Sequence, residues 1–209
     1  MALTTYTAPT TEPLTLAEVK AHLILDPTDS TDDHLLTMFI SSVRFAAEQI
    51  TKRAMITQTL DLTLDEFPKW ELCLPKPVLQ SVTSITYVDT AGASQTLSAS
   101  DYMVDIKTEP ARLTPAYGLY WPLTRYQMNA VTIRFVAGYG AAAAVPAGIK
   151  NWMLMRLATL WENRQAVVIE RGMNMIELPP SFIDGLLDPY RVYGVIDNEY
   201  RPITTYRHP

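Results

Sequence analysis

Apolar residues near the start of the chain recur every three or four positions, which is the spacing of a helix with one buried face. They follow Thr15-Leu16-Ala17-Glu18, a sequence in which threonine and glutamate side chains can satisfy each other's backbone amides as a capping box. The pattern continues to about Leu25, and Asp26-Pro27 interrupts it. A short first helix is therefore predicted over 16–25.

A longer helical pattern begins after the polar run 28–33, with Ser30 or Thr31 as the expected N-cap and acids in the first turn. It continues to about Arg53. Its apolar stripe is wide enough to pack on more than one neighbour, and it comprises Leu35, Leu36, Phe39, Ile40, Val43, Ala46, Ala47 and Ile50. We expect this to be the central helix of the fold.

From Thr57 the apolar spacing changes to every second residue, which is typical of strands with one buried face. A turn containing Gly92 is expected at 89–94, and Gly138 and Gly140 suit a turn with positive φ at the end of the region. Cys73 is expected within a strand. The predicted strands cover 57–64, 72–74, 82–88, 102–106, 111–113 and 131–136.

A third helix is expected from Pro146, a residue suited to a first helical turn, to about Gln165. A short fourth helix should follow Pro179-Pro180, with Ser181 as its cap, and end near Pro189. The buried stripe of the third helix is predicted to comprise Ile149, Trp152, Met153, the stem of Arg156, Leu157, Leu160 and Trp161.

These patterns together predict an α+β protein with a helical body of about four helices and a β-rich insertion between helices two and three. We expect a single domain over 1–209. The helical body would comprise 14–56 and 146–191, the insertion 57–140, and a C-terminal extension 192–209.

Composition supports an ordered chain, because 48% of the 209 residues are hydrophobic and 19% are charged. The single cysteine, Cys73, excludes an intrachain disulfide and leaves too few thiols for a cysteine zinc site. Apolar runs fall short of the ~20 residues that span a bilayer, so we expect no membrane contact and synthesis in the cytoplasm.

The net charge of −5 is concentrated in the first part of the chain, since residues 1–66 contain 10 acidic and 4 basic side chains. A protein that wraps duplex DNA through phosphate contacts needs clustered lysine and arginine. This mode of DNA binding is therefore not expected, although an acidic protein can lie beside DNA.

The sequence contains no recognisable catalytic constellation. Its three histidines, His22, His34 and His208, lack metal-ligand spacing. The acids between positions 26 and 33 lack the spacing and glycine of a calcium loop, and helix capping accounts for them better. Gly138-Tyr139-Gly140 lacks the remaining residues of a nucleotide-binding loop. We therefore predict no catalytic residue, no metal and no cofactor.

The order of motifs along residues 13–191 resembles the head-tail connector, or head-completion adaptor, family of long-tailed bacteriophages and prophages. The blocks that carry the resemblance are Leu14-Thr15-Leu16-Ala17-Glu18-Val19-Lys20-Ala21-His22-Leu23; Pro75-Lys76-Pro77-Val78-Leu79-Gln80-Ser81-Val82 leading to Tyr87-Val88-Asp89; Phe135-Val136-Ala137-Gly138-Tyr139-Gly140; Trp161-Glu162-Asn163-Arg164; and Leu186-Leu187-Asp188-Pro189-Tyr190-Arg191. The tail after Arg191 does not match.

The resemblance implies a virion structural protein at the head-tail junction. Identical subunits, twelve being expected, would form a ring beneath the portal protein, extend the DNA channel, and offer a surface to the tail-completion, or stopper, protein. Double-stranded DNA would pass through without its sequence being read. No reaction is required for this role.

Three groups of residues are candidate sites within such a ring. Asp29, Asp32 and Asp33 could line the channel and repel DNA phosphates, or could simply serve as helix-start and surface acids. Tyr117, Tyr120, Trp121, Arg125 and Tyr126 could form a subunit contact, or could cover the end of the insertion as a private core. Tyr200, Arg201, Tyr206 and Arg207 could dock on the portal, or could belong to a frayed terminus.

Two other classes of protein are alternatives. A small-molecule or peptide binding module would use the aromatic loop 117–126 and would bind its ligand saturably as a monomer. A hydrolase would show a pH-dependent rate that is lost when a histidine or carboxylate is replaced.

Overall fold

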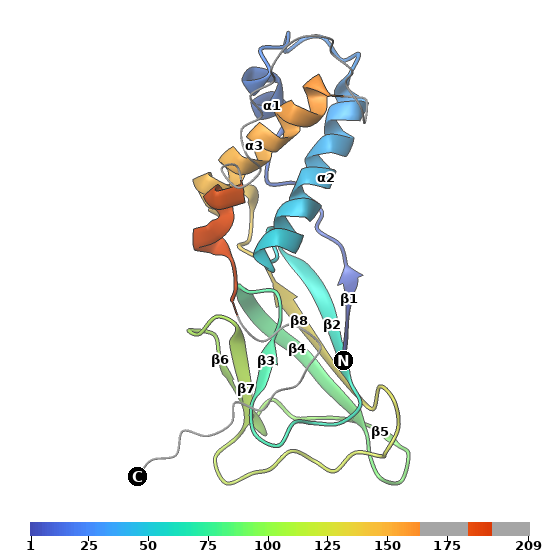
Figure 1. The fold of residues 1–209 in the computed structure, drawn as a ribbon. Helices are drawn as coiled ribbons and strands as arrows, with labels where there is room; N and C mark the ends of the chain where they lie inside the picture. Colours follow the sequence, from blue (N-terminus) through green and yellow to red (C-terminus); the bar gives the residue numbers. More distant parts are fainter. Residues whose placement is uncertain (164–183, 194–209) are drawn as a thin grey trace, which may run out of the picture.

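The helices gather at one end of an elongated molecule and the strands at the other (Figure 1). The structure is a computed structural model that describes residues 1–163 and 184–193. The predicted α+β class is confirmed, because a β-rich region lies between the second and third α-helices.

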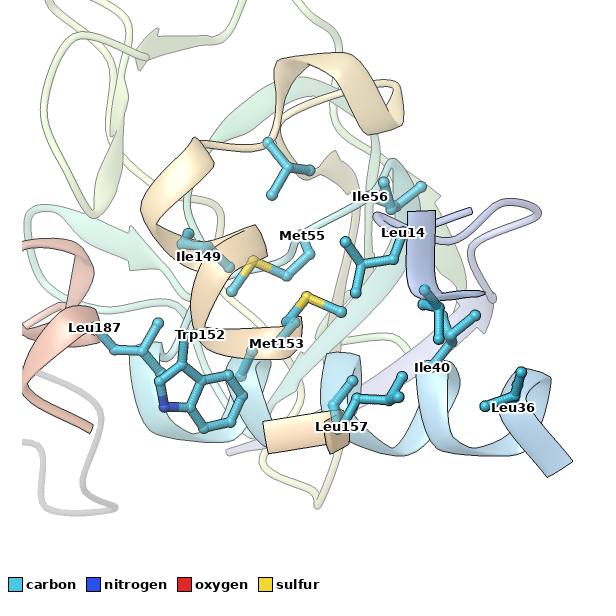
Figure 2. Close-up of a cluster of buried hydrophobic side chains, with 14 residues drawn as sticks. Leu14, Leu36, Ile40, Met55, Ile56, Ile149, Trp152, Met153, Leu157 and Leu187 are labelled. Carbon is cyan, nitrogen blue, oxygen red and sulfur yellow. The ribbon is translucent and has the colours of Figure 1, made fainter. Parts of the chain in front are cut away.

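The helical half is built from α1 (Leu16–His22), α2 (Asp33–Thr51) and α3 (Ala147–Glu162), with short 3₁₀ helices η1 (Ala142–Ala144) and η2 (Gly185–Tyr190). Figure 2 shows the core where these elements meet, with Trp152, Met153 and Leu157 of α3 among its residues. Its fully or almost fully buried members are Leu14, Val19, Leu36, Ile40, Val43, Ala47, Met55, Ile56, Val145, Ile149, Trp152, Met153, Leu157 and Leu187. The predicted apolar faces of α2 and α3 are thus both buried in this core.

The capping box at the start of α1 is confirmed. The Thr15 hydroxyl accepts from the Glu18 amide at 3.2 Å, and the Glu18 carboxylate accepts from the Thr15 amide at 2.7 Å. The helix ends at His22, earlier than the predicted Leu25. Its last turn closes when the Leu25 amide donates to the Lys20 carbonyl at 3.0 Å, which leaves Ile24 in a left-handed conformation with φ 56°.

The predicted cap of α2 is wrong. Asp32 occupies the N-cap position, and the Leu36 amide donates to its carbonyl at 2.9 Å. Thr31 instead donates its hydroxyl to Asp29 at 2.6 Å, so a local turn before the helix uses the side chain that was expected to cap it. Arg156 is a second correction, because it lies on the exposed face of α3 rather than in its buried stripe.

The strands form two antiparallel sheets. The larger has the order β1-β2-β8-β4-β5, with β1 at Ala2–Thr7, β2 at Gln58–Leu64, β8 at Val131–Ala137, β4 at Leu79–Val88 and β5 at Ser94–Thr96. The smaller has the order β3-β7-β6, with β3 at Leu72–Leu74, β7 at Ala111–Pro115 and β6 at Tyr102–Asp105. The sequence patterns indicated every strand except β1 and β5.

The two sheets share a second core. Along β8 buried and half-buried residues alternate strictly, and Val131, Ile133 and Phe135 are fully buried. Leu72, Leu74, Ala111 and Leu113 of the smaller sheet join the same cluster as Leu60, Leu62, Leu79 and Ile85 of the larger one. The sheets therefore pack on each other through their apolar faces.

A buried carboxylate connects the two halves. Glu48 on α2 is 5% exposed, and its carboxylate accepts from the Met55 amide and the Gln58 side chain at 3.0 Å each. Nearby, Gly138 has φ 128°, and a Cβ there would collide with the backbone of Ile56. The predicted glycine turn is confirmed, and it allows close approach of two backbones at the junction.

The fourth predicted helix is described only from position 184 onward. Its described part is the 3₁₀ helix η2, and its predicted cap at Ser181 lies outside the described residues. Leu187 of η2 is fully buried in the helical core, and the Trp152 indole donates to Asp184 at 3.1 Å. These contacts attach η2 to α3.

Candidate interaction surfaces

The aromatic loop 117–126 belongs to the connection, residues 116–130, that joins β7 to β8 at the far end of the sheet half (Figure 1). Its backbone is fixed at several points. The Arg125 amide donates to the Val88 carbonyl at 3.0 Å, Thr124 forms an isolated β-bridge with Asp89, and the Asn129 amide donates to Asp65 at 2.8 Å. This long connection is thus attached to the sheet half through residues 124, 125 and 129.

Trp121 belongs to the protein's own packing. Its indole stacks on Phe67 with the ring centroids 4.9 Å apart, and its N–H donates to the Trp70 carbonyl at 2.8 Å. Phe67 also meets Tyr87 edge to face at 5.8 Å. Trp121 therefore covers one end of the sheet core, as in the private-core alternative.

The other predicted members of the loop point outward. Tyr117 and Tyr126 are fully exposed, Tyr120 is 86% exposed, and Arg125 is also exposed. A hollow lies beside Tyr120, between residues 66–69 and 120–124. Exposed aromatic side chains on a hydrogen-bonded loop are typical of interface anchors, since less conformational entropy is lost on contact.

The acidic loop, residues 26–33, lies at the opposite end of the molecule, where α1 leads into α2 (Figure 1). Lys20 beneath it is 6% exposed, and its ammonium lies 2.6 Å from both the Asp33 carboxylate and the Asp29 carbonyl. The charge of Asp33 is therefore paired. The structure places the three predicted acids on one loop but does not leave all three charges free.

Two carboxylates of this loop are held in local turns. Asp26 accepts from the hydroxyl and amide of Thr28, and Asp29 accepts from those of Thr31. These hydrogen bonds hold the pKa of each carboxyl below its ordinary value, and the bond from the threonine hydroxyl has the larger effect. Both carboxylates stay ionised at neutral pH, so the loop presents negative charge.

The predicted docking tail, Tyr200, Arg201, Tyr206 and Arg207, lies outside the described residues. The stretch that precedes it is anchored at the junction of the two halves. Arg53 donates to the Tyr190 carbonyl at 2.6 Å, and the Val192 amide donates to the Thr51 carbonyl at 3.1 Å. Residues 190–192 therefore lie against the C-terminal end of α2.

The sequence patterns did not indicate which strands lie at the sheet edges. Within the described residues, β1 and β5 are the outer strands of the larger sheet, and β3 and β6 are those of the smaller one. Strands β3 and β5 are only three residues long, whereas β1, which pairs only with β2, and β6, which pairs only with β7, offer longer edges. Tyr6 of β1 lies over the Arg134 guanidinium at 3.3 Å, and Arg134 pairs with Asp61 at 2.7 and 2.8 Å. The uncharged, threonine-rich composition of the first residues was the signal available for β1.

The described residues contain no cluster of three or more histidine, cysteine or acidic side chains placed to hold a metal ion. His22 and His34 are exposed. Burial raises the pKa of the thiol of Cys73, a half-buried strand residue, which favours its protonated form. In the same described part of the chain, the helices fall short of the length and apolarity needed to cross a membrane.

No protein-family model and no curated protein matches the chain. The chain does resemble solved structures. A chain in the neck of an empty gene transfer agent particle, computed with C6 symmetry, is 23% identical, with a TM-score of 0.76 over 94% of this chain and 98% of that one. A chain of the native gene transfer agent virion is 24% identical with a TM-score of 0.74 and the same coverages.

A third similar chain comes from the neck of the native particle, computed with C12 symmetry; it is 23% identical, with a TM-score of 0.70 and coverages of 94% and 98%. At these identities the likeness establishes the fold. The chain has the fold of a virion neck component, and the resemblance to head-tail connectors predicted from the sequence is confirmed at that level. All three similar chains come from a gene transfer agent particle.

Proposed function

We propose that this chain is a structural subunit of the neck of a phage or phage-like particle, where it forms a head-tail connector. The observation that carries the proposal is the match over nearly the full length of both chains, at TM-scores of 0.76 and 0.70, to two chains of a particle neck, with a third match at 0.74 to a chain of the virion. Both the helical half and the β-rich half take part in that match, as its 94% coverage requires. No chemical reaction is part of the role.

The subunits are proposed to form a closed ring. Two of the similar chains come from necks computed with C6 and C12 symmetry, and cyclic symmetry requires each copy to use two different surfaces, one for each neighbour. Twelve copies of this chain, docked beneath the portal protein and followed by the stopper protein, would extend the DNA channel.

Within this ring the exposed side chains of the aromatic loop are proposed to meet another protein subunit. Tyr117, Tyr120 and Tyr126 support this because they expose aromatic surface on a fixed backbone. Trp121 has a different role, since its stack on Phe67 attaches the loop to the sheet core.

The acidic loop is proposed to face the channel, where negative charge would let DNA slide without sticking. Asp29 supports this better than Asp33, since the Asp29 side chain is exposed, whereas the Asp33 carboxylate is paired with Lys20. Replacing Asp29, Asp32 and Asp33 by asparagine should slow DNA ejection. Unchanged ejection would remove the channel role and leave the neck role in place.

Electron cryomicroscopy of the particle neck tests the proposed function. The expected result is a closed ring of this fold between head and tail, with its helical and β-rich halves at different heights. A neck reconstruction at side-chain resolution that contains no copy of the chain would overturn the proposal.

A further inference from the structure

We propose that neighbouring copies in the ring join by strand pairing, with the outer edge of β1 in one copy lying against the outer edge of β6 in the next. This inference rests on the proposed ring and adds to it the surfaces through which neighbouring copies meet. Each edge would pair with a strand of another copy of this chain.

The edge of β1 lacks the features that normally protect a sheet edge. Its sequence, Ala2-Leu3-Thr4-Thr5-Tyr6-Thr7, contains no charged residue and no proline, and every residue except Leu3 is exposed. A row of unpaired amides and carbonyls on such a strand is a template for another strand. Pairing with β2 is regular from Ala2 to Thr5 and shifts only beyond it, so four residues offer an undistorted edge.

The edge of β6 has the matching length and exposes apolar side chains. The strand is four residues long, Tyr102–Asp105, and pairs with β7 without a register shift. Met103 is 53% exposed, Val104 36%, and the following Ile106 58%. A strand laid along this edge would cover part of that apolar surface, which adds a hydrophobic contribution to the backbone hydrogen bonds.

The two edges face away from each other. In Figure 1 β1 and β6 lie on opposite sides of the sheet half, and β1 runs along the long axis of the molecule. Pairing of β1 with β6 therefore sets copies upright and side by side, each using one edge for each neighbour. Such a contact is heterologous, because it joins two different surfaces, and it closes into a ring when the rotation from one copy to the next divides a full turn. In a closed ring every β1 edge is paired with a β6 edge.

The β1 edge is also stiffened in place. Tyr6 stacks on Arg134, which is held by two hydrogen bonds to Asp61 on β2. On the other side, Arg112 of β7 pairs with Asp105 of β6 at 3.0 Å. Both edges are thus ordered before contact, which lowers the entropy cost of pairing.

Cysteine cross-linking in purified particles tests the contact. In a Cys73→Ser background, Thr4→Cys or Thr5→Cys is combined with Met103→Cys or Val104→Cys, giving four double variants that sample both faces of each strand. The four single variants are the matched controls. A short bismaleimide is added to the particles, the products are separated on a denaturing gel, and the neck is examined by electron cryomicroscopy.

The expected result is a ladder of covalent oligomers longer than a dimer in at least one double variant, with no cross-linked product in the single variants. Dimers from Thr4→Cys or Thr5→Cys alone would overturn the proposal, because they would show β1 paired with β1. No ladder in any double variant, while the neck still shows rings of this fold, would overturn the strand contact and leave the proposed function intact. Particles whose necks lack the chain would remove the proposed function and this contact with it.

Discussion

The indole of Trp121 lies parallel to the ring of Phe67, with 1° between the ring planes and 4.9 Å between their centroids. This stack connects the aromatic loop to the sheet core, while the neighbouring tyrosines remain exposed. Residues adjacent in the sequence thus have separate physical roles, one supporting the fold and the others available for contact.

Replacing Trp121 by alanine should lower the free energy of unfolding by about 2 kcal/mol, because the stack and the packing on the sheet core are lost. Urea denaturation of the purified chain measures this. Tyr126→Ala is the matched control, and because its side chain is fully exposed it should change stability by less than about 0.5 kcal/mol. Equal effects of the two substitutions would contradict the division of roles.

Replacing Glu48 by alanine should lower the free energy of unfolding by about 3 kcal/mol. The substitution leaves the buried Met55 amide and Gln58 side chain without the acceptor they share. The exposed neighbour Gln49 is the control, and Gln49→Ala should be nearly neutral. A urea midpoint for Glu48→Ala within error of the wild type would show that the junction does not depend on this carboxylate.

Replacing Ile24 by glycine should stabilise the protein by about 1 kcal/mol. Ile24 has φ 56°, a conformation that is unfavourable for a β-branched residue, and its side chain is 93% exposed, so almost no burial is lost. Thermal unfolding should show a higher midpoint for Ile24→Gly, with a smaller gain for Ile24→Ala. A lower midpoint for the glycine variant would indicate that the isoleucine side chain makes a stabilising contact.

Acid should weaken the capping box of α1. The backbone amide of Thr15, followed by its hydroxyl, lowers the pKa of Glu18 below the ordinary 4.5. A lowered folded pKa gives stability that is present above pH 4.5 and is lost as the pH falls through the folded value. The stability difference between the wild type and Glu18→Gln should therefore shrink below pH 4.5.

A pH series of urea denaturations measures that difference, with Glu66→Gln, an exposed loop carboxylate, as the control. A difference that stays constant from neutral pH to well below 4.5 would mean that the charge of Glu18 does not contribute to the cap.

Local patterns were sufficient to predict most of the fold. The Thr15 and Glu18 cap, the apolar faces of α2 and α3, and the alternation along β2 and β8 all arise within one element, where spacing decides which side chains are buried. The prediction of the α2 N-cap was wrong because the Thr31 side chain has two possible partners, the first turn of the helix and Asp29, and the sequence does not distinguish them.

What the sequence did not predict depends on contacts between distant residues. Strand β1 has no alternation of its own, and it forms by pairing Ala2–Thr5 with residues 60–63. The sequence identified the aromatic loop but did not show that Trp121 and its neighbour Tyr120 have different roles. That difference arises because the Trp121 ring packs on Phe67, which is distant in the sequence, while Tyr120 is exposed. Which strands are outermost among the described residues follows from sheet order, and no local pattern encodes that order.

The most direct test of the proposed neck role is electron microscopy of a lysate in which the gene for this chain carries an early stop codon. The proposed function predicts heads and complete tails that remain separate, with joining restored when the chain is supplied from a plasmid. Normally joined particles in the absence of the chain would contradict it.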